Sequence, residues 1–195
     1  MTAEIVFSRV WAMPNHDTLD IGPIGDLSRR WVAMSAAKMI IDPFARNSNI
    51  GSHTNDLNPK TGAMFHLDAV EFIDKMIGQH GQESFDMAIL DPPYSPRQIA
   101  ECYSMVGRKV GMEETQTARL YKECKDRLAR LLRPSGIAIT IGWSSVGFGI
   151  NRGFTIREIM LVCCGGAHND YIVTVEQKDD GLIRQPEMML EGANP

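Results

Sequence analysis

Two apolar runs in this chain stop at the same dipeptide, an aspartate followed by a proline. They are "AAKMIIDPF" at 36–44 and "SFDMAILDPPY" at 84–94. Continuous apolar stretches of this length are typical of strands buried on both faces, and proline cannot donate to the hydrogen-bond ladder of a central strand. Each run therefore predicts a buried strand that ends at its aspartate and leads into a loop.

Helical patterns and further strand-like runs alternate with these two strands. Asp68 is a plausible N-cap, and apolar residues follow it at helical spacing as far as Met76. Residues 113–132 predict the clearest amphipathic helix, with Leu and Cys side chains on one face and Lys and Arg on the others. A turn is expected at 134–136. Strand-like runs then follow at 137–143, 155–165 and 170–178.

This alternation predicts the α/β class, with a mostly parallel, twisted sheet and a C-terminal antiparallel hairpin. The chain has 195 residues, of which 44% are hydrophobic, so it can bury one core. We expect a single domain over 1–178, which opens with a polar, turn-rich segment at 1–35, and a peripheral tail at 179–195. Residues 95–112 and 144–154 are expected to be loops.

The charge balance and the cysteines exclude several classes of function. A formal net charge of −4 and a pI near 5.7 argue against nonspecific coating of nucleic acid, because such binding needs many Lys and Arg to neutralise phosphates. The four cysteines show no CxxC spacing, so we expect no metal site and interpret them as free thiols in a reducing cytoplasm. We expect neither a signal peptide nor a membrane span, since no apolar stretch of about 18 residues occurs.

Four aspartates stand where predicted strands end, namely Asp42, Asp56, Asp68 and Asp91. In an open parallel sheet, ligands bind outside the carboxyl ends of the strands, where the loops converge. We therefore expect at least two of these carboxylates to contact a ligand. The alternative is a set of proline-terminated strands whose acids are only solvated.

The stretch 91–94, Asp-Pro-Pro-Tyr, resembles the signature of the amino-group DNA methyltransferases that use S-adenosyl-L-methionine, specifically their adenine N6 branch. Four more stretches within 11–178 are similar to motifs of that family in the same order. They read "MIIDPF", "TNDLNP", "HLDAVEFI" and "LLRPSGIAITIGW". The resemblance implies a Rossmann-like class I methyltransferase fold, S-adenosyl-L-methionine as cofactor, and DNA with an adenine target as partner.

The resemblance also implies catalytic roles for Asp91, Pro92, Pro93 and Tyr94. The exocyclic nitrogen of adenine is a poor nucleophile because its lone pair is delocalised into the ring. If Asp91 and the Pro92 carbonyl accept hydrogen bonds from its N–H groups, the lone pair can be aimed at a methyl donor. Two prolines would preorganise this turn, and Tyr94 would offer a flat face to a base that has left the helix.

For the cofactor, the resemblance implies that Asp56 receives ribose hydroxyls and that Asp68 bonds the adenine, with Phe44 packed beside it. Asp42, followed by Pro43, would face the methionine amino group. The segment 1–35 would pack against the methionine end. Its weaker candidates, for which a plain structural loop is an equal alternative, are Thr18, Ile21 and Pro23.

The match departs from the family at the cofactor loop, where Arg46 and Ser48 stand in place of two glycines. Glycine permits close approach to a ligand and positive φ, and Arg46 could either line the cofactor carboxylate or block the site. Two alternatives to a DNA enzyme therefore remain, an RNA adenine methyltransferase and a catalytically inactive binding subunit. A homodimer and a separate partner subunit are both left open.

Overall fold

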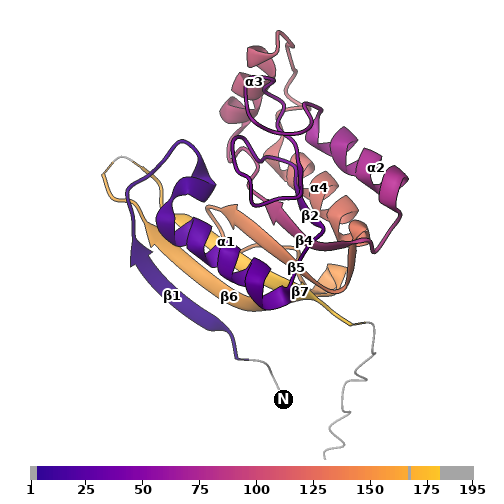
Figure 1. Cartoon of the computed structure of the whole chain (residues 1–195). Coiled ribbons are helices and arrows are strands. Elements are labelled where there is room, and N and C mark those ends of the chain that lie inside the picture. The colour runs from indigo at the N-terminus through magenta and orange to yellow at the C-terminus, as the bar shows by residue number, and fades with distance from the viewer. Residues whose placement is uncertain (1–3, 167, 181–195) are drawn as a thin grey trace, which may run out of the picture.

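The computed structural model describes residues 4–166 and 168–180, which form one seven-stranded sheet with the order β1-β6-β7-β5-β4-β2-β3 (Figure 1). β7 runs antiparallel to both of its neighbours, and the other neighbouring pairs are parallel. The predicted α/β class with a C-terminal antiparallel hairpin is confirmed. The strands are β1 (Val6–Trp11), β2 (Ile40–Asp42), β3 (His53–Thr54), β4 (Phe85–Leu90), β5 (Leu132–Gly142), β6 (Phe154–Cys163) and β7 (Tyr171–Lys178).

Helices cover both faces of the sheet, which makes the architecture Rossmann-like. α1 lies over one face, whereas α2 and α4 pack together over the other (Figure 1). Within the described ranges, no helix is both long and apolar enough to cross a bilayer. The helices are α1 (Gly22–Ser35), α2 (Ala69–His80), α3 (Pro96–Met105) and α4 (Thr117–Leu131), with short 3₁₀ turns η1 (Thr18–Asp20) and η2 (Ile150–Arg152).

The central strand β4 shows why its sequence is apolar throughout. Met87 and Ile89 belong to the core under α1, whereas Ala88 and Leu90 belong to the core under α2 and α4. Because successive side chains of a strand point to opposite faces, a strand buried on both sides has no polar position to spare. The strand predicted to stop at Asp91 ends at Leu90, as its proline pair requires.

Both remaining helix predictions agree with the structure. Asp68 caps α2, and its side chain accepts a hydrogen bond from the Val70 amide at 3.0 Å. α4 occupies most of the amphipathic stretch predicted at 113–132.

Three stretches differ from the sequence prediction. The segment 1–35 is not simply turn-rich, because it contains β1, η1 and α1. The stretch 95–112 was expected to be a loop and contains α3, which begins at the Ser95 cap with a proline in its first turn. The turn expected at 134–136 lies within β5, where Ser135 adopts a φ of 62° and the pairing with β4 shifts register. A bulged strand absorbs the residues that looked like a turn.

We expect Phe72→Ala to reduce the free energy of unfolding by about 3–5 kcal/mol, because the Phe72 side chain of α2 is fully buried in the core under α2 and α4. Phe7→Ala is the matched control, since the Phe7 side chain on the edge strand β1 is 67% exposed and should lose less than about 1 kcal/mol. Urea denaturation measures both values. Equal losses in the two variants would contradict the assignment of the core.

Candidate functional site

The carboxylates at the strand ends converge at one edge of the sheet. Asp42 is the last residue of β2, Asp91 directly follows β4, and these two strands pair in parallel. Asp56 follows β3 on the other side of β2. The charges of Asp91 and Asp56 both raise the pKa of Asp42, so the three groups are close enough to interact.

Asp42 is fully buried, and one of its carboxylate oxygens has no hydrogen-bond partner. Its Oδ1 accepts from the Phe44 amide at 3.1 Å, whereas Oδ2 has none. Burial raises the pKa of Asp42 to about 8, and the neighbouring carboxylates act in the same direction. Because buried polar atoms are almost always paired, this oxygen is suited to a ligand that brings a cation or an N–H donor.

The segment 43–48 after β2 keeps a glycine-like backbone at one position although it contains no glycine. Arg46 has a φ of 50°, in the left-handed region that usually favours glycine. Its Nε donates to Asp17 Oδ1 at 2.6 Å, and Asn47 Nδ2 donates to Asp17 Oδ2 at 2.9 Å. The Asn47 hydrogen bond, followed by the Arg46 pair, holds the pKa of Asp17 below its usual range despite partial burial. Arg46, which stands in place of a glycine of the family's motif, is therefore hydrogen-bonded to Asp17 in the N-terminal segment.

On one side of Phe44 lies a cavity of about 10 Å³, lined by Thr18, Arg46, Phe44 and Asp91 among others. A volume of this order holds about one water molecule. Arg46 and Asp17, which form an ion pair, both line this cavity together with Asp91.

On the other side of Phe44 lies a cavity of about 60 Å³ with apolar walls and carboxylates at its edge. Asp56 and Asp68 both line it, and Tyr103 donates a hydrogen bond to Asp68 Oδ2. An apolar slot bounded by two carboxylates can hold a flat ring and accept hydrogen bonds from amino or hydroxyl groups. Its apolar lining includes Phe44, Leu67, Ile99, Met105 and Leu120.

The turn after β4 is internally bonded. The Tyr94 hydroxyl donates to Asp91 Oδ1, and the Tyr94 amide donates to Gln98 Oε1 at 2.7 Å. Burial raises the pKa of Asp91 to about 6, although hydrogen bonds from Tyr94 and Thr18 oppose the rise. With a pKa of about 6, the Asp91 carboxyl is mostly ionised at neutral pH.

The three weaker candidates of the N-terminal segment, Thr18, Ile21 and Pro23, lie in different surroundings in the structure. Thr18 lines the cavity beside Asp91. Ile21 lies in the core under α1, and Pro23 occupies the first turn of α1. Neither of these two lines either cavity.

Sequence reasoning missed the contribution of α3 to the 60 Å³ cavity. Ile99, Cys102 and Tyr103 reach it from this helix, and Tyr103 bonds the carboxylate of Asp68. The dipeptide Ser95-Pro96 was the available signal, because serine at an N-cap followed by proline marks a helix start.

Comparisons with protein-family models and with curated proteins give no match. Solved structures do match. PH0851 has 14% identity over 77% of this chain and 45% of its own, with a TM-score of 0.49. Burkholderia thailandensis 1,6-didemethyltoxoflavin-N1-methyltransferase, with 1,6-didemethyltoxoflavin and S-adenosylhomocysteine bound, has 15% identity over 80% and 77% of the two chains, with a TM-score of 0.49. The putative methyltransferase yhhF from Escherichia coli has 11% identity over 86% and 92%, with a TM-score of 0.48. The chain thus spans less than half the length of PH0851.

We expect Asp42→Asn to stabilise the protein relative to wild type, and more strongly at alkaline pH. Between about pH 4 and pH 8, the unfolded chain has lost the Asp42 proton while the folded chain keeps it, so wild-type stability falls as pH rises. Asparagine does not titrate. Urea denaturation at about pH 5 and about pH 8 measures the two differences in free energy of unfolding. Equal differences at both pH values would contradict the raised pKa.

Proposed function

We propose that this protein is a methyltransferase that uses S-adenosyl-L-methionine to methylate the N6 amino group of adenine in DNA. The observation that carries the proposal is the turn 91–94, whose carboxylate lies beside a second, buried carboxylate with an open hydrogen-bond position. That pairing supports a site in which one acid holds a substrate amine and the other a cationic group of the methyl donor.

The residues around Phe44 fit the cofactor by their chemistry. The unpartnered Asp42 oxygen suits its methionine ammonium, and the slot edged by Asp56 and Asp68 suits its ribose and adenine. When bound there, S-adenosyl-L-methionine supplies a methyl group activated by the positive sulfonium. The cavity of about 10 Å³ is too small for the methionine end, so its walls, which include Arg46 and Asp17, would have to move apart when this group binds.

The turn 91–94 would position the substrate amine. Asp91 and the Pro92 carbonyl accept its two N–H groups, which frees the nitrogen lone pair to point toward the donor side of the site. The two prolines fix the carbonyl before the substrate arrives, so the acceptors need no reorganisation. Tyr94 would offer a stacking face to an extruded base, and its ring packs against Trp143 with 5.2 Å between the centroids.

A panel of duplex DNA, single-stranded DNA and RNA, each incubated with methyl-labelled S-adenosyl-L-methionine, tests the proposal. Nucleoside analysis should find N6-methyladenine in DNA. Label confined to RNA would replace the DNA substrate by the RNA alternative, because an unpaired adenine suits the same turn.

Arg46 favours a second candidate function, a noncatalytic subunit with a methyltransferase-like fold. Arg46 and its ion-pair partner Asp17 both line the cavity beside Asp91, whose volume is only about 10 Å³. Calorimetry with S-adenosyl-L-methionine separates the two functions. No heat of binding and no thermal shift would support the noncatalytic subunit.

We expect Asp91→Ala to lower the rate of methyl transfer by about a hundredfold or more while sparing affinity for S-adenosyl-L-methionine, because Asp91 acts on the substrate amine. Asp56→Ala should instead weaken cofactor affinity by about tenfold, because it lines the slot of about 60 Å³. Calorimetry and transfer assays on both variants measure the split. Full turnover by Asp91→Ala would refute its role.

A further inference from the structure

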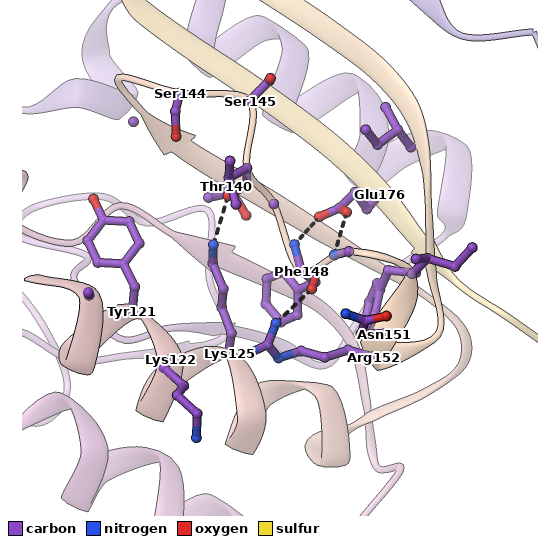
Figure 2. Close-up of a pocket in the computed structure, with 18 of the residues that line it drawn as sticks. Tyr121, Lys122, Lys125, Thr140, Ser144, Ser145, Phe148, Asn151, Arg152 and Glu176 are labelled. Atoms are coloured by element: carbon purple, nitrogen blue, oxygen red, sulfur yellow. Dashed lines mark hydrogen bonds between the residues drawn. The ribbon is translucent and has the colours of Figure 1, made fainter.

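A large groove of about 1140 Å³ opens beside the turn 91–94, and the roles assigned so far do not use it (Figure 2). It lies between α4, the end of β5 and the loop 143–153. Tyr94 lines its near end, so the groove is continuous with the proposed catalytic turn. Pockets for ligands of moderate size measure about 300–1,000 Å³, so this groove has room for more than one group.

The loop wall of the groove is held in place from beneath by two buried charged side chains. Glu176, 1% exposed, accepts hydrogen bonds from the amides of Phe148 and Gly149. Lys125 Nζ donates to the Val146 carbonyl at 2.8 Å (Figure 2). A Cβ at Gly147 would lie 1.9 Å from a Glu176 oxygen, so only glycine permits this approach. The groove is therefore preformed.

The floor of the groove presents hydrogen-bonding groups whose capacity is not filled. Thr140 is 3% exposed, and its hydroxyl has no partner. Lys125 is 5% exposed, and its ammonium has three donors, one of which meets Val146. Figure 2 shows both side chains pointing into the same part of the groove. Buried donors of this kind call for a ligand that carries hydrogen-bond acceptors.

Aromatic rings flank this polar floor. Tyr94, Tyr121 and Trp143 all line the groove, and Trp143 is 45% exposed although it packs against Tyr94. Val146 and Ile150, which are 71% and 82% exposed, line it as well. Aromatic faces around buried donors fit a flat, aromatic ligand whose edge bears a carbonyl or a ring nitrogen.

Charge around the groove disfavours a phosphate. The Glu176 carboxylate lies in its lining, and Asp126 pairs with both Lys122 and Arg152. These carboxylates neutralise the nearby cations that a phosphate would need. A nucleobase, which is flat, uncharged and rich in acceptors, matches the groove better.

We propose that this groove binds the nucleobase next to the target adenine on the substrate strand. The base stacks on Trp143, and its acceptor edge meets the Thr140 hydroxyl and the Lys125 ammonium. The inference rests on the proposed function, because Tyr94 connects the groove to the turn that receives the target. Bases with a carbonyl at this edge are preferred, which gives the protein a short sequence preference.

Fluorescence anisotropy with a labelled single-stranded DNA oligonucleotide that contains one adenine tests the proposal. An abasic residue in place of each neighbouring base in turn should weaken binding about tenfold at one of the two positions. Thr140→Val and Trp143→Ala should each weaken binding of the intact oligonucleotide about fivefold or more. Neither substitution should change binding of the oligonucleotide whose abasic residue stands at the sensitive position. Thr140→Val should keep or raise the melting temperature, because it removes an unsatisfied buried hydroxyl.

Thr174→Val is the matched control. Thr174 pairs with Thr140 across β5 and β7, is 1% exposed and also has an unpartnered hydroxyl, but it does not line the groove. It should bind the oligonucleotide as wild type does. Wild-type affinity in both groove variants, or in both abasic oligonucleotides, would overturn the inference.

Methyl transfer to the same oligonucleotide, measured in parallel, separates the two levels of failure. Transfer by the wild type without any effect of the groove variants or the abasic residues overturns the groove assignment alone. Absence of transfer to every nucleic acid of the panel overturns the proposed function and the groove assignment together.

Discussion

Parallel pairing between β2 and β4 is the constraint on which the site depends. The register Ile40 to Met87 and Ile41 to Ala88 places the two strand ends side by side, and each strand ends where a proline follows an aspartate. Two carboxylates thereby meet at a buried edge, and burial, followed by the charges of Asp91 and Asp56, raises the pKa of Asp42. A fold retains such an arrangement when a bound group compensates the charge.

Features that depend on residues close together in the sequence could be predicted from the sequence. The two Asp-Pro dipeptides predicted the ends of β2 and β4. Asp68 predicted the start of α2, because a capping side chain accepts a hydrogen bond from a free amide of the first turn. The alternation of apolar runs with an amphipathic helix was enough to predict the α/β class and the mostly parallel sheet, because each element must bury its apolar side against another.

Features that depend on tertiary contacts were not readable. β1 is an edge strand whose Phe7 and Trp11 are exposed, so its sequence lacks the alternation of a half-buried strand. The sequence showed that Arg46 and Ser48 stand in place of two glycines, but only the structure reveals that Arg46 takes the left-handed backbone and pairs with Asp17, 29 positions away. Likewise, Glu176 and Lys125 act on the loop 143–153 from distant elements, and no spacing rule connects them.

The ion pair between Arg46 and Asp17 forms part of the wall of the cavity beside Asp91. If a ligand can enter this space of about 10 Å³ only while the pair is apart, its apparent rate of association falls in proportion to the fraction of time the pair is open. Salt screens a partly exposed ion pair. Rising ionic strength would therefore hasten uptake at this cavity, the reverse of its usual effect on charged partners.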